Sequence, residues 1–342
     1  MSKVFAVALL AITAATLFYK AHDAAGRNPH FPVEVIQAFK EWQGQHNKMY
    51  SRPGETFYRL AIFAERLASI KAHNAKPDQT YTQGLNQFSD MTYEEFLIKF
   101  TGDLNQEQFE SLGEENSAPL PLGLSQGGWD WTQKGAVNPV QNQGQCGGCW
   151  SFAATASFEA AYFNKFNTLM KFSEQAGIDC DKGNSGCGGG SPDTAMAFQK
   201  QYGLPALSDY PYTAQDGTCK LAGKKVSKSL NFSYSFPSSA SLLQAAIQKG
   251  VTYISIYANQ NFMNYKSGIF SDPNCSTGPT NHAVAAVGYD AGMTYWKIRN
   301  SWGAQWGEAG YVRMQNLAGT YGTCYMFKRN AVTLDVNQYG PQ

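Results

Sequence analysis

The chain has 342 residues, more than one folding unit usually holds, so at least two units are expected. Its net charge is only +1 and its Lys and Arg residues are dispersed, which excludes the basic footprint of a nucleic-acid-binding protein. There are 7 cysteines, an odd number that predicts three disulfides and one free thiol if the chain enters an oxidising compartment.

The first residues fit an export signal. Lys3 precedes an apolar run over residues 4–19, and small residues suited to cleavage follow at Ala21, Ala24 and Ala25. A membrane anchor is the alternative, but about 16 apolar residues fall short of the roughly 20 that span a bilayer. We therefore expect residues 1–25 to be removed and no membrane span to remain. In that pathway Asn231 and Asn274, each in an N-X-Ser/Thr sequence, are candidate glycan acceptors.

The next part of the chain has a helical pattern. Apolar residues recur every three or four positions over residues 33–42 and 57–70, which predicts two amphipathic helices around a turn at residues 51–54. Residues 84–90 alternate like a short extended segment, and residues 91–96 begin another helix with Thr92 as its cap. Residues 104–128 are first acidic and then rich in Ser, Gly, Leu and Pro, which is typical of an exposed connector.

Beyond the connector, helix is expected first and strands later. Residues 149–166 predict a long buried helix, and residues 179–219 form a Gly-, Ser- and Pro-rich region that disulfides would have to hold. Strand patterns cover residues 252–257, 282–289, 294–299 and 310–314. This order predicts an α+β unit with two subdomains and a cleft between them.

Cys149 is the candidate nucleophile. A thiolate is a far better nucleophile than a thiol, and a sulfur at the first turn of a helix lies beside unpaired N–H groups and the positive end of the helix dipole. If a protonated imidazole and the helix end together lowered the thiol pKa from about 8.5 to about 4, the thiolate would gain roughly 6 kcal/mol relative to the thiol.

The imidazole partner is expected to be His282. The chain has 5 histidines, and four of them precede the connector. Asn300 can orient the ring through its amide oxygen, and Trp302 can cover that hydrogen bond. Two non-catalytic alternatives stay open. In one, His282 has only a structural role at the start of a strand; in the other, Asn300–Gly303 is only a turn between strands.

An oxyanion also needs donors placed in advance. The backbone N–H of Cys149 is one candidate, and the side-chain amide of Gln143 is the other. The Cys146-x-x-Cys149 spacing leaves two further alternatives, a redox pair or a zinc site. No βαβ pattern supports the first and no second Cys/His pair supports the second, so we expect no metal.

These residues together resemble the papain-like cysteine peptidases, in particular the cathepsin L-like branch. Gln143, Cys149, His282 and Asn300 match the oxyanion, nucleophile, general acid/base and orienting positions of that family. The likeness runs over about residues 125–330, and a cysteine of lowered pKa paired with a histidine is typical of the family. It implies a two-subdomain fold with a helical half and a β-barrel-like half, and no cofactor.

The resemblance also implies a disulfide pairing. Sequence alone allows 15 connectivities for six cysteines. The family pattern pairs Cys146 with Cys187, Cys180 with Cys219 and Cys275 with Cys324, which leaves Cys149 free. Each bond would close a loop of about 40 to 50 residues and stabilise the fold by about 4 kcal/mol in the chain-entropy model.

The N-terminal region is similar to the inhibitory prosegment of that branch. Its interspersed helical motif is matched by Glu55, Arg59, Phe63, Ile70 and Asn74, and the short motif after it by Gly84, Asn86, Phe88 and Asp90. We therefore expect residues 26–117 to form a small helical inhibitor that runs through the cleft against the substrate direction. Residues 118–342 would be the mature peptidase, with cleavage between about residues 117 and 125.

Three positions depart from the family pattern. Arg66 replaces Asn, which is expected to weaken the prosegment slightly; Gly148 replaces Ser or Ala, which loosens the loop; Asn281 replaces Asp, which alters the pH profile. No insertion like the carboxypeptidase-conferring loop of cathepsin B lies between residues 180 and 219, so endopeptidase action is favoured.

Substrate specificity is also implied by the resemblance. Trp302 borders the cleft, and the pocket for the second residue on the amino side of the scissile bond is expected to be lined by Gly189, Gly190, Ser255, Ala283 and Arg329. A cationic floor at Arg329 predicts tolerance of acidic or polar substrate residues. In the alternative, Arg329 points outward to solvent.

The sequence thus predicts a monomeric zymogen that acts on polypeptides and is inhibited by its own prosegment, in a lysosome or vacuole or outside the cell. The alternative function is that of a binding protein, in which a papain-like chain has no catalytic activity.

The charge distribution generates a first prediction. Residues 1–117 carry net charge −3 and residues 118–342 carry +4. If Coulomb attraction helps to hold the acidic prosegment, protonation of its carboxylates weakens that hold. We expect purified zymogen to mature faster at roughly pH 4.5 than at pH 7, where carboxylates are ionised. Equal rates at the two pH values, followed by gel electrophoresis, would argue against this.

Overall fold

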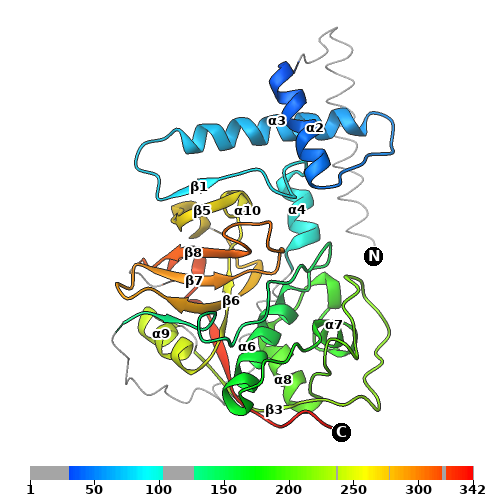
Figure 1. The fold of residues 1–342 in the computed structure, drawn as a ribbon, viewed down its shortest axis with the longest axis vertical. Coiled ribbons are helices and arrows are strands. Elements are labelled where there is room, and N and C mark those ends of the chain that lie inside the picture. The colour runs from blue at the N-terminus through cyan, green and yellow to red at the C-terminus, as the bar shows by residue number, and fades with distance from the viewer. Residues whose placement is uncertain (1–30, 103–126, 236–237, 277, 318–320, 342) are drawn as a thin grey trace. The chain divides into compact units, whose positions relative to one another are not determined.

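The computed structural model describes residues 31–102, 127–235, 238–276, 278–317 and 321–341 (Figure 1). The expected signal at residues 1–25 and nearly all of the expected connector lie outside this range. One compact unit takes in the described residues up to Pro77 together with Gly84–Phe96, and a second takes in Asp78–Gln83 and the chain from Leu97 onward.

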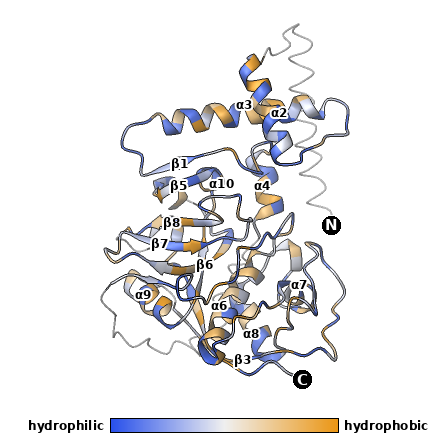
Figure 2. Ribbon diagram, viewed as in Figure 1, coloured by the Kyte–Doolittle hydropathy of each residue, from blue (hydrophilic) through white to orange (hydrophobic). Residues whose placement is uncertain are grey.

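The smaller unit is built on two helices, α2 (Val33–Gln45) and α3 (Glu55–Asn74). Both ribbons alternate between apolar and polar bands, as the sequence periodicity predicts (Figure 2). Phe63 of α3 lies with its ring centroid 5.2 Å from that of Phe39 and 5.4 Å from that of Trp42. These three buried rings form the core of the unit.

Arg59 and Arg66 tie α3 to the segment that follows it. Arg59 lies 2.6 Å from Glu95 but 3.9 Å from Glu55, so its main partner is distant in sequence and not the neighbour on its own helix. Arg66 is buried, and its Nη2 donates to the carbonyl of Met91 at 2.9 Å. An arginine at this position therefore makes a contact of its own inside the unit.

The expected extended segment at residues 84–90 is wrong. The strand lies just before it, as β1 (Tyr81–Gln83), and residues 87–90 form a turn. Short side chains stabilise that turn locally: Asn86 Oδ1 accepts from the Phe88 N–H, and Ser89 Oγ accepts from the Asn86 N–H.

The helix expected after this turn is confirmed as α4 (Tyr93–Phe100). Thr92 Oγ1 accepts from the Glu95 N–H and the Glu95 carboxylate accepts from the Thr92 N–H, which is a capping box.

The larger unit contains a sheet of 9 strands in the order β1-β5-β8-β7-β6-β4-β9-β3, with β2 also paired to β6. Among the described residues the path of strand pairing ends at β1 and β3. The four strands predicted from sequence are present within one or two residues of the expected bounds. The strands are β2 (Trp129–Asp130), β3 (Ser229–Ser235), β4 (Thr252–Ile256), β5 (Tyr265–Phe270), β6 (His282–Tyr289), β7 (Tyr295–Arg299), β8 (Tyr311–Gln315) and β9 (Asn330–Val336).

Helix α6 (Cys149–Phe166) has the bounds predicted from sequence, and its small side chains let it pack on several sides. It contacts α7 (Glu174–Cys180), α8 (Pro192–Gln201) and strands β4, β6 and β9. Figure 1 shows α6, α7 and α8 grouped together within this unit, while α9 (Ala240–Lys249) lies near the strands. The short helices are α10 (Gln260–Met263), η2 (Gly186–Gly188), η3 (Pro273–Ser276) and η4 (Thr323–Tyr325).

The disulfides fasten loops to helix α7 and to the short helices η2, η3 and η4. Cys146 bonds Cys187, Cys180 bonds Cys219 and Cys275 bonds Cys324, as the resemblance implied, and Cys149 is free. In the described part of the chain no helix combines the length and the apolar character needed to cross a bilayer.

A buried ion cluster joins α6 to α7 and generates a second prediction. Lys171 Nζ lies 2.8 Å from Glu159 and also bonds Glu174. Replacing one partner of a buried pair costs about 3–5 kcal/mol, so we expect Lys171→Met in a Cys149→Ser background to lower the free energy of unfolding by that amount near pH 7.

Burial raises the pKa of Glu174, and Lys171 opposes the rise. Without the lysine the folded state therefore favours the protonated acid more strongly. The free energy of unfolding of the variant should fall as pH rises from the carboxyl pKa of the unfolded state towards the higher carboxyl pKa of the folded state. The difference in stability between the variant and the protein that keeps Lys171 should therefore shrink at low pH. Lys165→Met is the control, because its pair with Asp335 is more than one-third exposed. Equal losses in the two variants in denaturant titrations would contradict the prediction.

Candidate active site

Cys149 lies at the first position of α6, directly after Gly148 at the N-cap, and is fully buried. The backbone N–H groups of Cys149, Trp150, Ala283 and Gly102 are close enough to its sulfur to favour the thiolate. Burial has the larger effect and raises the pKa of the thiol to about 11. In this structure the thiol is therefore protonated at neutral pH. The shift is opposite to the lowered pKa that the sequence analysis expects of an active nucleophile.

His282 begins strand β6 and is also fully buried. Its Nε2 lies 2.8 Å from Asn300 Oδ1, and that same oxygen accepts from the Ser301 N–H at 2.8 Å. Because Oδ1 is an acceptor, the ring proton belongs on Nε2, which leaves Nδ1 as the basic nitrogen. Nδ1 has no hydrogen-bond partner among the described residues.

Trp302 shields the histidine as the sequence predicted. The rings of His282 and Trp302 stack with centroids 4.5 Å apart and an interplanar angle of 22°. Burial lowers the pKa of His282 to about 4, while its bond to Asn300 works in the opposite direction. The ring is therefore neutral at neutral pH in this state. Since the N–H of the next residue, Ala283, reaches the Cys149 sulfur, the structure brings the two candidate catalytic groups to one place.

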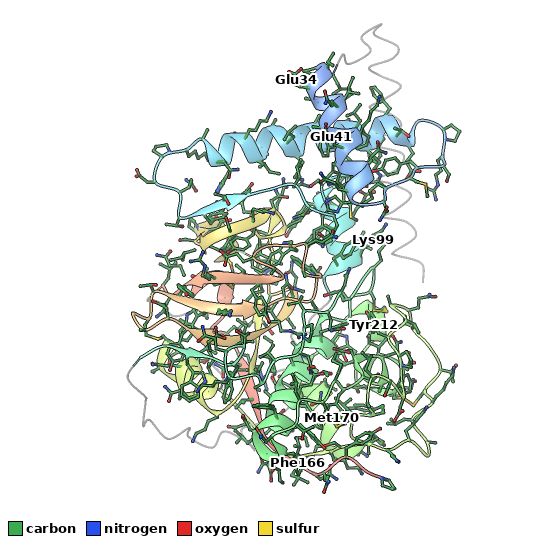
Figure 3. All side chains as sticks on the ribbon, in the orientation of Figure 1. Glu34, Glu41, Lys99, Phe166, Met170 and Tyr212 are labelled. Carbon is green, nitrogen blue, oxygen red and sulfur yellow. A yellow bond between two sulfur atoms is a disulfide. The ribbon has the colours of Figure 1, made fainter. Side chains whose placement is uncertain are left out.

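Gln143 is buried next to this pair on the loop before α6. Its Oε1 accepts from the Ser301 hydroxyl at 2.6 Å, which fixes the direction of the amide. Its Nε2 then donates to the carbonyls of Cys146, at 2.8 Å, and Phe100, at 3.1 Å. The loop is held further by Tyr212, which is labelled in Figure 3 and comes from a distant part of the chain. Its hydroxyl donates to the Gln143 carbonyl at 2.7 Å.

Residues Phe100–Gly102 cover the reactive groups. The Phe100 carbonyl accepts from Gln143 Nε2 and from Trp302 Nε1, and the Gly102 N–H donates to the Asn281 carbonyl at 3.1 Å. A Cβ on Gly102 would lie 3.7 Å from the Cys149 sulfur, 2.9 Å from the Gly147 oxygen and 3.0 Å from the Gly189 Cα. The chain therefore passes directly over the thiol, and a side chain at position 102 would not fit.

Gly148 and Asn281, two of the departures from the family pattern, have structural reasons. A Cβ on Gly148 would lie 2.9 Å from Ile178 Cδ1, so the isoleucine fills the space that a larger residue would need. Asn281 bonds both the N–H and the carbonyl of Ala258, which holds the chain just before His282.

The residues expected to line the substrate pocket lie on several elements around the thiol. Gly189 lies against Gly102, and Ser255 pairs with Ala283 across β4 and β6. Gly190 follows Gly189 in the same loop, where a Cβ would clash with Asn184. Arg329 does not point to solvent: it is buried, and its Nε lies 2.7 Å from Asp193 Oδ2. Its charge is therefore matched, and Asp193 is a residue that sequence reasoning missed.

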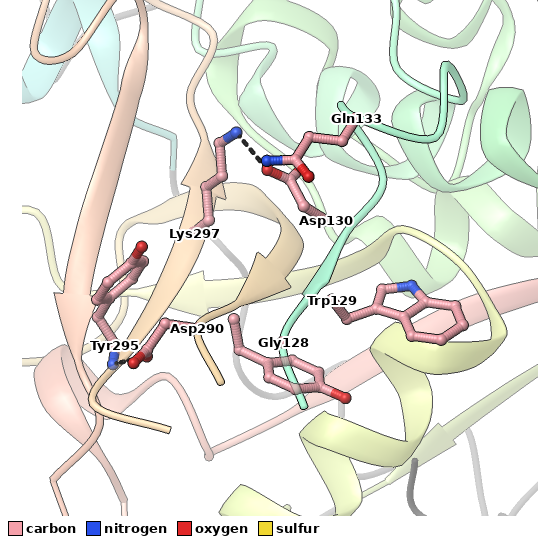
Figure 4. Close-up of a pocket in the computed structure, with 8 residues that line it drawn as sticks. Gly128, Trp129, Asp130, Gln133, Asp290, Tyr295 and Lys297 are labelled. Carbon is pink, nitrogen blue, oxygen red and sulfur yellow. Dashed lines mark hydrogen bonds and ion pairs between the residues drawn. The ribbon is translucent and has the colours of Figure 1, made fainter. Parts of the chain in front are cut away.

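A separate pocket lies on the surface of the larger unit, beside β2 and β6. It is lined by Gly128, Trp129, Asp130, Gln133, Tyr289, Asp290, Tyr295 and Lys297 (Figure 4). Lys297 Nζ bonds Asp130 at 2.8 Å across it. None of the four candidate catalytic residues lines this pocket. No group of three or more His, Cys, Asp or Glu side chains in the described residues is arranged to hold a metal ion.

Comparison with known proteins now decides the family. The model of the "Papain family cysteine protease" matches residues 126–333, and that of the "Cathepsin propeptide inhibitor domain (I29)" matches residues 39–96. The chain belongs to the papain family of cysteine proteases. It is the proform of a papain-like peptidase, a hydrolase that carries an inhibitor domain in the same chain.

Its similarity to individual relatives extends over most of its length. Papaya proteinase 4 of Carica papaya is 37% identical over 305 residues, which cover 86% of this chain and 85% of the relative. A cathepsin L-like proteinase of Fasciola hepatica is 36% identical over 293 residues, covering 82% and 88%.

Solved proforms share the fold. The structure of a recombinant stem bromelain precursor matches with a TM-score of 0.79 and 34% identity, covering 88% of this chain and 99% of that one. Digestive procathepsin L 3 of Tenebrio molitor larval midgut gives a TM-score of 0.77 and 32% identity, covering 87% and 98%.

The cover over the thiol generates a third prediction. In the full-length proform Gly102→Val should displace the segment, because its side chain would meet backbone atoms that cannot rotate away. We expect alkylation of Cys149 by iodoacetamide at pH 7 to be at least about tenfold faster, since uncovering restores water and lowers the thiol pKa. Gly44→Val in α2 is the control, because a Cβ there meets nothing within 4 Å. An unchanged labelling rate in Gly102→Val would contradict the prediction.

Proposed function

We propose that Cys149, His282, Asn300 and Gln143 carry out peptide-bond hydrolysis in the uncovered enzyme. The observation that carries this proposal is the bond from His282 Nε2 to Asn300 Oδ1, because it leaves Nδ1 as the basic ring nitrogen of the residue next to Ala283, whose N–H reaches the sulfur of the one free thiol. A silent binding protein would not require that tautomer. The presence of all four groups in one place favours a peptidase over that alternative.

The first step is transfer of the thiol proton to His282 Nδ1. Removal of Phe100–Gly102 returns water to both groups, which removes the main cause of the high thiol pKa and of the low imidazole pKa. The backbone N–H groups at the start of α6 then favour the thiolate without opposition from burial. An ion pair of thiolate and imidazolium becomes the favoured form.

The thiolate sulfur attacks the peptide carbonyl carbon, and the carbonyl oxygen takes the displaced electron pair. Gln143 Nε2 and the Cys149 N–H donate to that oxyanion. Imidazolium Nδ1–H protonates the amine as the C–N bond breaks, leaving a thioester on Cys149. Nδ1 next takes a proton from water, whose oxygen attacks the thioester carbon. The C–S bond then breaks, the carboxylic acid leaves, and the imidazolium returns its proton to the released thiolate. Asn300 keeps the ring oriented throughout.

Gln143 connects catalysis with inhibition. In the proform the Phe100 carbonyl accepts one of its two amide hydrogens, while the Cys146 carbonyl accepts the other. The position of the Phe100 oxygen is therefore the one that a substrate oxygen would take. We infer that the prosegment inhibits by occupying this donor as well as by covering the thiol.

The remaining assignments follow the sequence analysis. We propose removal of residues 1–25 as a signal, inhibition by residues 26–117 and a mature endopeptidase of residues 118–342. The substrate contacts proposed are Gly189, Gly190, Ser255, Ala283, Trp302 and Arg329. The enzyme is proposed to act as a monomer in a lysosome or vacuole or outside the cell. Exposure of both Asn231 and Asn274 supports their glycosylation.

The oxyanion role generates a fourth prediction. Gln143→Ala in matured enzyme should lower kcat by about 10²–10³, because one preorganised donor is lost. Stoichiometric labelling of Cys149 by a thiol-alkylating peptide analogue should persist, since the thiol remains. Gln145→Ala is the matched control, as this side chain is exposed on the same loop. A kcat unchanged by Gln143→Ala would exclude the oxyanion role, and wild-type enzyme without labelling or peptidase activity would favour the binding protein.

A further inference from the structure

Three buried polar side chains meet in the larger unit, apart from the catalytic group. Asp193 lies in the first turn of α8, Tyr253 lies on β4, and Arg329 directly precedes β9. Arg329 Nε is 2.7 Å from Asp193 Oδ2, and the Tyr253 hydroxyl donates to Asp193 Oδ1. All three residues are at most 3% exposed. We refer to them as the Asp193 triad.

The Asp193 triad borders the place where a peptide would lie. Tyr253 and Ser255 share one face of β4, and two residues along a strand span about 7 Å. Ser255 pairs with Ala283, whose N–H reaches the Cys149 sulfur. Tyr253 of the triad is therefore only two residues along β4 from Ser255, which lies next to the backbone that contacts the Cys149 sulfur.

The glycine loop approaches the same region from the other side. Gly189 touches Gly102, the residue that covers the sulfur, and Asp193 follows four residues later at the start of α8. A substrate backbone that replaces Gly102 would lie between Gly189 and the sulfur. A neighbouring substrate side chain would enter between this loop and Ser255, with the triad beneath it.

The charges of the triad determine what such a side chain meets. Arg329 carries a guanidinium group, and a buried cation attracts an anion strongly unless a counter-ion is in place. Asp193 supplies that counter-ion. Burial raises the pKa of its carboxyl, and the contact with Arg329 works against the rise. With Asp193 ionised, the pair carries no net charge.

We propose that Asp193 is a specificity-determining residue: it neutralises Arg329, so that the pocket accepts uncharged substrate side chains and rejects acidic ones. The inference rests on the proposed function. It replaces the expectation of a cationic floor with a neutral one, and it assigns the discrimination to the counter-ion of Arg329.

The test compares two peptides that differ only by Gln or Glu at the second residue on the amino side of the scissile bond. Matured enzyme is first titrated with a thiol-alkylating peptide analogue and then assayed at about pH 6.5, where the Glu side chain is ionised. We expect wild-type enzyme to have a kcat/KM for the Gln peptide at least about tenfold above that for the Glu peptide, from the unfavourable burial of an unpaired charge.

Three variants separate charge from packing. Asp193→Asn keeps the shape but removes the negative charge, and should shift the Glu-to-Gln ratio of kcat/KM upward by about tenfold or more, as a buried opposite-charge contact requires. Adding Arg329→Met to it should abolish that shift. Tyr253→Phe removes a hydrogen bond of the triad but neither charge, so the wild-type ratio should persist.

The outcomes distinguish the two proposals. Wild-type enzyme that neither cleaves the Gln peptide nor labels on Cys149 would contradict the proposed function itself. Active wild-type enzyme that cleaves both peptides equally well, or an Asp193→Asn variant with the wild-type ratio, would overturn the specificity role alone. If Asp193→Asn does not fold, the ratio of kcat/KM for the two peptides in wild-type enzyme still tests the proposal. Equal kcat/KM values for the Glu and Gln peptides are incompatible with a neutral pocket that rejects anions.

Discussion

Desolvation of the Cys149–His282 pair is the constraint on which this proform depends. A thiolate and an imidazolium stabilise each other where water or fixed dipoles surround them, but burial favours the neutral form of both groups. In the described structure both residues are fully buried, and their pKa values move in the directions that keep them uncharged. The protein therefore holds its candidate catalytic groups in place while preventing the charge separation that the proposed reaction requires.

The fold supplies the parts of this arrangement separately. Cys149 comes with α6, His282 with β6, and Asn300 with the end of β7, so packing of α6 on the sheet determines their meeting. The Cys146–Cys187 disulfide joins the loop of Gln143 to the glycine loop at Gly189. The Lys171 cluster joins α6 to α7. These contacts fix the backbone on both sides of the sulfur before any substrate binds.

Much of this could be read from sequence because the signals are local or because a known family carries them. The 3.6-residue pattern of α2 and α3, the bounds of α6 and the helix cap at Thr92 depend on nearby residues. Candidate roles for Gln143, His282 and Asn300 rested on the chemistry of these side chains and on their joint resemblance to one family. The turn after Asn86 was misjudged because residues 84–90 alternate as a strand does, whereas the side chains of Asn86 and Ser89 hydrogen-bond nearby backbone N–H groups and fold the segment into a turn. Asp193 was missed because its partner Arg329 lies far along the chain, and a buried ion pair between such positions leaves no periodic signal.

The covering segment is covalently joined to the enzyme that it covers, and this has a consequence for concentration. A tethered segment acts at an effective concentration of the order of millimolar, regardless of how dilute the protein is. A cut beyond Gly102 breaks none of the bonds from Phe100 to Gln143 and Trp302, or from Gly102 to Asn281. It converts them into contacts between two molecules. From then on, dilution releases the cover, so the same cleaved protein is more fully inhibited in a concentrated solution than after dilution into a larger volume.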